Sequence, residues 1–243
     1  MRLGALQPGY LPWLGFFDQI VRCDAFILYD ELPYARDKWR NRNRIRTPQG
    51  WYWLTVPLVK QEKSHKPLRE VEISEQGNWR RHHWQTIKNH YASAPHYRDH
   101  EAFFAGIYEK RWRYLVDLDL EIIFYLLRVL QIETKIIRSS EEGLEAEHLR
   151  TKSSGKDPTA RVAFLCRRLG ADSFLEGALG RTLMDPTRLN PLGITLEFHD
   201  YQHPSYHQLF EGFIPYLSVI DLLFNHGLES LDILTGRTVV CAR

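Results

Sequence analysis

The sequence predicts an α/β fold with a mainly parallel central sheet flanked by helices and an antiparallel β-hairpin inserted after the second strand. Residues 1–30 run from a short apolar stretch through a turn-rich loop and a helical pattern to a second apolar stretch, which is the order of a βαβ unit. Two strand-like segments joined by the turn sequence TPQG follow. Helical patterns and short apolar runs then alternate toward the C-terminus, as a parallel sheet requires.

The opening βαβ unit is predicted element by element. RLGALQ is a strand closed by Pro8, LPWLGFFDQIVRC is a helix with Pro12 near its first turn, and AFILYD is a strand that ends at Asp30. Ligands of such folds bind in loops at the carboxyl ends of parallel strands. We therefore expect ligand-binding groups in QPGYLP and in the segment after Asp30.

The insertion spans residues 33–75 and begins with RDKWRNRNRIR (36–46), in which every second residue is a cation. These cations are Arg36, Lys38, Arg40, Arg42, Arg44 and Arg46. Side chains of a strand alternate between its faces, so an extended segment gathers all six on one face. WYWLTVPL (51–58) is the second strand of the hairpin, and REVEIS (69–74) is a further strand.

The remaining elements follow from helical periodicity and from their boundary residues. We expect helices over 78–95, 100–130, 157–171 and 217–227, with Asn78 and Asp157 as N-caps and Gly227 as a stop. ETKIIRSS, SFLEGALG and NPLGITLEFHDY are strands. Residues 139–157 are polar without apolar periodicity and are predicted to form a mobile loop. With no linker in view, residues 1–243 form a single α/β domain.

Composition narrows the class of protein. Of the 243 residues 44% are hydrophobic and 26% are charged, which is ordinary for a globular protein. Because the net charge is only +2, a local row of cations favours binding of a single anionic ligand over general binding of polyanions. The three cysteines form no CxxC pair, and no signal peptide or membrane span is recognisable, which favours a cytoplasmic protein. The histidines lack metal-ligand spacing, and we predict no metal site.

The cation row is the first candidate site. Six like charges on one face repel one another unless an anion or an acidic partner neutralises them. Arginine outnumbers lysine five to one, which suits bidentate recognition of phosphate or carboxylate. The other face offers Trp39 for stacking and the amides of Asn41 and Asn43. The alternative is a solvated edge strand that its charges protect from aggregation.

Two strand-end segments add neutral and acidic groups. Gln7 and Tyr10 lie in the first βα loop, ahead of a helix N-terminus whose dipole attracts anions. Glu176 and Gly177 end a later strand, where glycine lets a ligand approach the backbone. A rigid turn is the alternative reading of both segments.

The C-terminal segments supply the groups suited to proton transfer. His203 can act as a general acid or base near neutral pH and lies close to Tyr206 in the sequence. Asp221 and Asn225 are four residues apart on one helix face, which can orient His203 or bind an amine. A buried structural hydrogen bond is the alternative role for each of these residues.

The ordered set of motifs resembles the WbqC-like protein family. The resemblance rests on QPGYLPWLGFFDQI, DAFILYDELPY, KWRNRNRI, WLTVPL, LGADSFLEG, HPSYHQLF and LSVIDLLFNHG, which run in order from Leu3 to about Gly227. It implies a role in the biosynthesis of surface glycans such as O-antigen, of other polysaccharides or of natural products, with acyl or aminoacyl transfer to an amino group among the suggestions. The family positions found here are Gln7, Pro8, Tyr10, Pro12, Gly15, Asp30, Trp39, Asn41, Arg42, Asn43, Glu176, Gly177, Gly180, Arg181, His203, Pro204, Tyr206, Ser218, Asp221 and Asn225.

Together these observations predict a transferase that uses a small-molecule anionic donor, such as a nucleotide-sugar or an acyl carrier, and an amine or hydroxyl acceptor. Arg40, Arg42 and Arg44 would clamp the anion, and a desolvated Asp30 or His203, with Asp221, would supply the base. No cofactor is identified. The alternatives are a nucleic-acid-binding protein, which is the less favoured partner class, and a non-catalytic scaffold of a biosynthetic complex.

Overall fold

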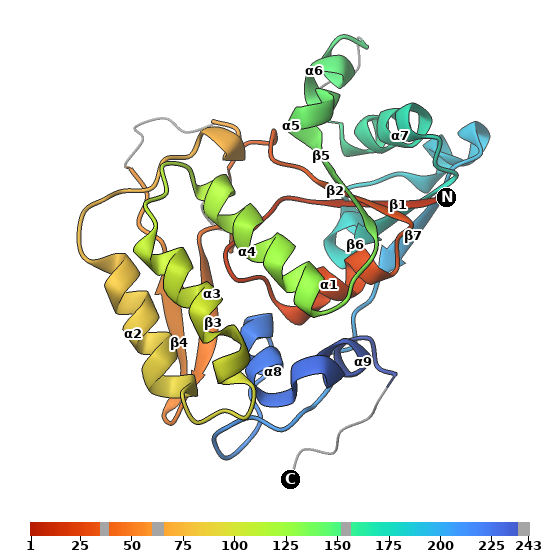
Figure 1. The fold of residues 1–243 in the computed structure, drawn as a ribbon. Coiled ribbons are helices and arrows are strands. Elements are labelled where there is room, and N and C mark those ends of the chain that lie inside the picture. Colours follow the sequence, from red (N-terminus) through yellow and green to blue (C-terminus); the bar gives the residue numbers. More distant parts are fainter. Residues whose placement is uncertain (35–38, 60–65, 152–156, 238–243) are drawn as a thin grey trace. The chain divides into compact units, whose positions relative to one another are not determined.

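A computed structural model of the chain describes residues 1–34, 39–59, 66–151 and 157–237. Its contacts fall into two units. Figure 1 shows the helices and strands of the chain, coloured along the sequence. Unit 1 comprises Met1–Gln7, Asp18–Leu32 and Glu133–Gln202, and unit 2 comprises Pro8–Phe17, Pro33–Ile132 and His203–Arg243. The chain passes between the units several times, so each unit is assembled from stretches that are distant in sequence.

Unit 1 is built on a parallel sheet. Its strands are β1 (Arg2–Leu6), β2 (Ala25–Leu28), β5 (Lys135–Arg138), β6 (Ser173–Gly177) and β7 (Thr195–His199), and they lie in the order β5-β2-β1-β6-β7. Every neighbouring pair is parallel. The chain lays β2 and β5 on one side of β1 and then β6 and β7 on the other. The predicted mainly parallel α/β sheet is confirmed.

The two faces of this sheet bury different partners. Leu3 and Phe174 point toward α7 (Pro158–Leu169) and join its Val162 and Leu165 in one apolar core. The other face receives the end of α1 (Leu14–Val21) and the turn after it. A side chain at Gly4 would collide there with the Cys23 sulfur and the Phe26 ring, so glycine permits this close packing.

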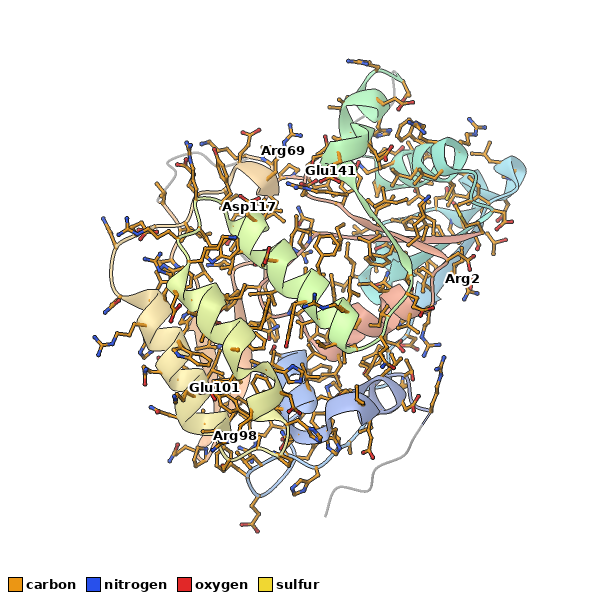
Figure 2. All side chains as sticks on the ribbon, viewed as in Figure 1. Arg2, Arg69, Arg98, Glu101, Asp117 and Glu141 are labelled. Atoms are coloured by element: carbon orange, nitrogen blue, oxygen red, sulfur yellow. The ribbon has the colours of Figure 1, made fainter. Side chains whose placement is uncertain are left out.

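Unit 2 combines helices with the hairpin. The hairpin consists of β3 (Arg42–Thr47) and β4 (Gly50–Thr55), paired antiparallel across the predicted turn. The longer helices are α2 (Trp79–Tyr91), α3 (Tyr97–Glu109), α4 (Leu115–Val129) and α8 (Val219–His226). Figure 2 labels Arg98 and Glu101 on α3 and Asp117 on α4. The β3–β4 hairpin confirms the predicted antiparallel insertion after the second strand.

Short elements complete the chain. The short α-helices are α5 (Ser139–Glu142), α6 (Leu144–Leu149) and α9 (Ser230–Leu234). The 3-10 turns are η1 (Leu68–Glu70), η2 (Ala178–Thr182), η3 (Pro186–Arg188), η4 (Asn190–Leu192) and η5 (Gly227–Glu229). No helix among the described residues is long and apolar enough to cross a bilayer.

Aromatic rings form much of the interior of unit 2. Phe224 of α8 contacts the rings of Tyr91, Tyr97 and Phe104 at centroid distances of 5.2, 5.5 and 5.6 Å. All three contacts are edge-on, which is a favourable geometry for aromatic pairs. Part of the high aromatic content of the sequence is therefore a packed core.

Three predicted elements differ from the structure. REVEIS forms no strand, because Glu72 and Ile73 make single bridges to different segments and η1 precedes them. The predicted helix over 100–130 is two helices, α3 and α4, separated between Glu109 and Leu115. The predicted loop over 139–157 contains α5 and α6, joined at Gly143 with φ of 63°, and its residues 152–156 lie outside the described part of the chain. Mobility of that segment stays a prediction.

Two of the three predicted helix ends, at Asp157 and Gly227, agree with the structure, and the cap predicted at Asn78 agrees only in position. Asp157 accepts a hydrogen bond from the Ala160 amide and Pro158 opens α7, as predicted. Gly227 ends α8. Asn78 does precede α2, but its side chain makes no capping bond.

Candidate functional site

The β3–β4 hairpin presents alternate side chains to its two faces, as the sequence predicted. One face collects the arginines of β3 and their ladder partners on β4: Arg42 with Thr55, Arg44 with Trp53 and Arg46 with Trp51. The opposite face centres on Ile45 and Leu54, which are fully buried. The residue pattern of this strand thus separates a buried face from a cationic and aromatic one.

The cation row is shorter than predicted. Trp39 and Arg40 lie in a turn ahead of β3, so the strand begins at Arg42. Trp39 belongs with the arginines rather than with the amides, because the Arg44 guanidinium carbon lies 5.0 Å from its ring centroid. Arg36 and Lys38 lie outside the described residues.

Two arginines stand among three tryptophans on the outer face. The Arg42 guanidinium carbon lies 4.7 Å from the Trp53 ring centroid, and that of Arg44 lies 5.2 Å from the Trp51 centroid. Trp39 and Trp51 keep 39% and 46% of their surface exposed. We call Trp39, Arg42, Arg44, Trp51 and Trp53 the tryptophan–arginine face.

The charges of this face are not neutralised by the chain as far as it is described. Arg44 donates one hydrogen bond to the Tyr216 carbonyl at 3.1 Å, and its buried Nε has no acceptor among the described residues. Burial lowers the pKa of Arg44. Within the described ranges neither Arg42 nor Arg44 pairs with a carboxylate. Indole stacking leaves guanidinium N–H edges available, so the face suits a ligand that combines an anion with a planar ring.

Arg46 has a structural role. Its guanidinium donates to the carbonyls of Thr47 and Gly50 in the hairpin turn. It also donates to carbonyls in the 210–212 segment, including those of Glu211 and Gly212. The side chain is buried at 3% exposure, and its donors join the hairpin to that segment. Membership of the cation row therefore did not predict availability for an anion.

Arg40 also faces inward, toward a buried acid. Asp119 of α4 is fully buried, neither carboxylate oxygen has a hydrogen-bond partner among the described residues, and burial raises its pKa well above the ordinary value despite the attraction of Arg40. Desolvation lowers the pKa of Arg40 to about 10. The predicted anion clamp is thus reduced to Arg42 and Arg44 in the described conformation.

The amides and the first loop support the hairpin. Asn41 donates to the Val56 carbonyl and accepts from the Tyr34 hydroxyl, and Asn43 donates to the Leu11 carbonyl at 2.7 Å. Tyr10 donates its amide to the Arg40 carbonyl. Asn43 and Tyr10 join the hairpin segment to the first loop, whereas Asn41 bonds the segments that flank the hairpin. The contact of these three predicted substrate-binding residues with a substrate stays a prediction.

Tyr10 enters a buried polar cluster. Its hydroxyl contacts the Tyr108 hydroxyl and lies 2.9 Å from Nδ1 of His83. Burial and the neighbouring His82 lower the pKa of His83 to about 3, so the imidazole is neutral and accepts from Tyr10. No local sequence pattern indicates this cluster, because its members come from the first loop and two helices.

The predicted proton-transfer residues of unit 2 are hydrogen-bonded. His203 donates from Nδ1 to the Pro204 carbonyl, and its Nε2 accepts from the Tyr216 amide at 3.1 Å. Asp221 accepts from the hydroxyls of Tyr91 and Tyr206 at 2.7 and 2.9 Å. Burial raises the pKa of Asp221 to about 6, although the two tyrosines oppose that shift. A base role for His203 would require its amide contact to open.

Asn225 borders a cavity of unit 2. Its Nδ2 donates to the Asp221 carbonyl, and its Oδ1 is buried without a partner among the described residues. The cavity measures about 690 Å³ and is also lined by His96, Asp99, His100 and His226. Across the described residues no three acidic, histidine or cysteine side chains are placed to hold a metal ion.

Unit 1 gathers two predicted residues where its strand order reverses. Gln7 follows β1 and donates to the Leu32 carbonyl, and Glu176 lies near the end of the adjacent β6. Such reversal points are where open parallel sheets bind ligands. Burial raises the pKa of Glu176 to about 7, opposed by the Gly177 amide, and among the described residues Glu176 forms no ion pair.

Asp30 is a hydrogen-bonded carboxylate, and the desolvation expected for it does not raise its pKa. Its oxygens accept from Arg138, Ser139 and Ser140, the first at 2.7 Å. Burial alone would raise the pKa of Asp30, but these donors outweigh burial and lower it. The carboxylate therefore stays ionised near neutral pH, and it joins the ends of β2 and β5.

Comparison with known proteins identifies a family over the part of the chain that holds the motifs. The WbqC-like protein family matches residues 7–233 of the sequence. The chain belongs to this family. As a WbqC-like protein it is 34% identical over 235 residues to a Mycobacterium tuberculosis protein named "Uncharacterized protein Rv1507c", a match that covers 96% of this chain and 97% of that one. No solved structure matches the chain.

Sequence reasoning missed two parts of this WbqC-like chain. Trp51 and Trp53 complete the tryptophan–arginine face, and the alternation of WYWLTVPL opposite the cation row could have indicated them. The second is a contact between Asp18 and His199 in unit 1, at 2.6 Å. These residues are 181 positions apart, so no spacing rule links them.

Proposed function

We propose that this WbqC-like protein is a biosynthetic transferase of surface-glycan or natural-product pathways that takes an activated, anionic, ring-bearing donor on its tryptophan–arginine face. A nucleotide-sugar has this chemistry, and so does an acyl carrier that ends in a nucleotide. The donor would pass an acyl, aminoacyl or glycosyl group to an amine or hydroxyl. Family membership supports the biosynthetic role, and the face supports the donor class.

The proposal rests on one observation. Two arginines lie against exposed indole rings, and neither has an acidic partner among the described residues. Arg42 and Arg44 retain N–H edges for a phosphate or carboxylate, while Trp39 and Trp51 expose ring surface. A charge-assisted hydrogen bond contributes roughly 1.5–3 kcal/mol, and stacking on an exposed ring roughly 1–3 kcal/mol. One contact of each kind corresponds to a Kd between about 10 mM and about 40 μM.

A thermal-shift screen tests the donor class. The protein is heated with nucleotide-sugars, nucleotide-bearing acyl thioesters, nucleoside diphosphates, and the same sugars without phosphate. A ligand that binds only the folded state raises the melting temperature, so a shift should appear with the anionic ring-bearing compounds alone. Equal shifts with uncharged sugars, or no shift from any nucleotide compound at millimolar concentration, would remove the proposal.

Single-stranded nucleic acid is the second candidate, favoured by the three tryptophans beside two arginines on one face of the hairpin. Successive bases stack on such rings while arginines contact phosphates. The two candidates differ in salt dependence, because each neutralised phosphate of a single strand contributes a slope of about −0.7 to log K against log salt. Oligonucleotide binding with a steep slope and no response to mononucleotides would select nucleic acid.

A further inference from the structure

A histidine, an aspartate and an arginine converge in unit 1, on the sheet face that carries the end of α1. Nε2 of His199, the last residue of β7, lies 2.6 Å from Oδ2 of Asp18. Arg22 donates to both Asp18 oxygens, at 2.6 and 3.1 Å. Asp18 is fully buried, and His199 is 8% exposed.

The arginine and the carboxylate determine which nitrogen of the imidazole is basic. Burial alone would raise the pKa of Asp18, but the bonds from His199 and Arg22 outweigh it and lower that pKa, so Asp18 is an ionised acceptor. When the imidazole is neutral, a carboxylate that accepts from Nε2 holds the proton there and leaves the lone pair on Nδ1. Within the described residues His199 makes no second hydrogen bond.

Other groups packed around the histidine leave this arrangement intact. Arg2, labelled in Figure 2, occupies the same sheet face. Its guanidinium pairs with Glu197 at 2.8 Å. The ring of Tyr201 stacks on His199 with centroids 5.7 Å apart. The neighbouring acid is therefore already paired, and Asp18 is the carboxylate that faces the imidazole.

Gly177 leaves open space beside this histidine. The β6–β7 register pairs Gly177 with His199, so the two positions point to the same face of the sheet. A Cβ built on Gly177 meets no atom within 4 Å. Its φ of −64° and ψ of 158° suit any residue. Neither packing nor backbone geometry requires glycine here, and the space lies at the carboxyl edge of the sheet.

We propose that His199 is a catalytic general base that accepts, at Nδ1, a proton from a hydroxyl or uncharged amine of a small molecule bound over Gly177. The O–H or N–H bond breaks, its electron pair stays on the oxygen or nitrogen, and the proton forms a bond to Nδ1. Asp18 stabilises the resulting imidazolium. Asp18 and Arg22 are positioning residues, because they hold the ring and its tautomer. The proposal goes beyond donor binding and stands independently of the tryptophan–arginine face.

Histidine side-chain NMR tests the tautomer directly. Long-range ¹H–¹⁵N spectra of labelled protein at pH 8, with His199→Gln to assign the signals, should show a protonated Nε2 and an unprotonated Nδ1 for His199. Asp18→Asn should abolish that preference. A proton on Nδ1 in the wild-type protein, or an imidazolium that persists at pH 8, would overturn the proposal.

Acylation by diethyl pyrocarbonate tests whether Nδ1 is reachable and basic. Mass spectrometry follows the acylation of each histidine. His199 should be acylated in the native protein, and its rate should fall at least about ten-fold in Asp18→Asn, which is the size of effect that other carboxylates supporting a histidine have. Arg22→Gln gives a second variant if Asp18→Asn fails to fold, and the exposed neighbour Asp200→Asn is the matched control. An unreactive native His199, or equal rates in the folded positioning variant and the control, sinks the proposal. Neither measurement uses a donor, so failure here is distinguishable from failure of the proposed function.

Discussion

The side chain of Glu176 occupies the volume that a side chain at Gly180 would need. A Cβ placed on Gly180 would overlap the Cγ of Glu176 and approach its carboxyl carbon to 3.0 Å. Gly180 belongs to the 3-10 turn η2 that follows β6, and its backbone covers the glutamate. This packing keeps Glu176 partly out of water, and burial raises its pKa to about 7.

Gly180→Ala should therefore displace Glu176 toward solvent. We expect a loss of about 1–3 kcal/mol in the free energy of unfolding, typical of overpacking. The pKa of Glu176 should fall toward the ordinary carboxyl range as its burial decreases. Denaturant unfolding and carboxyl ¹³C titration measure the two effects. Gly177→Ala is the control, since a Cβ there meets no atom and should leave stability almost unchanged. Equal effects of the two variants would contradict this account.

Arg46→Lys should destabilise unit 2 although it keeps the charge. The guanidinium donates to carbonyls of the hairpin turn and of the 210–212 segment at once, and a lysine ammonium cannot reproduce that fork. We expect a loss of roughly 2–4 kcal/mol, from two or more charge-assisted bonds and the carbonyls left unpaired. Thermal and urea unfolding report it. Arg42→Lys is the matched substitution on the same strand, and a loss as large there would show that the two arginines have equivalent roles.

His83 should make the protein less stable in mild acid. Its folded-state pKa of about 3 lies below its ordinary value of 6.5, so the unfolded chain binds a proton that the folded chain refuses. The stability that a neutral His83 contributes is complete above pH ~6.5 and declines as the pH falls toward the folded pKa. The decline is about 2 kcal/mol at pH 5, from 1.36 kcal/mol per pH unit.

The His83→Gln variant isolates that contribution. Asp221 titrates in the same range with the opposite sign, because its pKa is raised to about 6, and it is present in both proteins. The difference in unfolding free energy between wild type and variant should shrink by about 2 kcal/mol from pH 7 to pH 5. The exposed His82→Gln serves as the control. A difference that does not change with pH would mean that folding leaves the pKa of His83 unshifted, which would contradict this account.

The sequence predicted the parts of the fold that depend on local patterns. The βαβ start, the hairpin and the Asp157 cap rest on periodicity and on turn or cap residues, and each is confirmed. REVEIS failed because alternation indicates an extended segment but not a continuous partner strand, and Glu72 and Ile73 bridge different segments. The two helices within 139–157 escaped notice because they are short and polar.

The site was predictable only in part, because alternation determines a face but not what covers it. Arg42, Arg44 and Arg46 share a face, yet Arg46 is used by the 210–212 carbonyls, which lie far along the chain. Arg40 sits before the strand and faces Asp119. Contacts between distant segments decide such outcomes, and the local pattern of a sequence does not specify them.

The central claim is that Arg42 and Arg44 hold an anion beside exposed indole rings. Its most direct measurement is the affinity of the donor found by the thermal screen, followed by tryptophan fluorescence, for wild type, Arg42→Ala, Arg44→Ala and the exposed control Arg81→Ala. The account predicts a loss of about 2 kcal/mol, roughly thirty-fold in Kd, for each of the first two variants and none for the control. Unchanged affinity in folded Arg42→Ala and Arg44→Ala would contradict it.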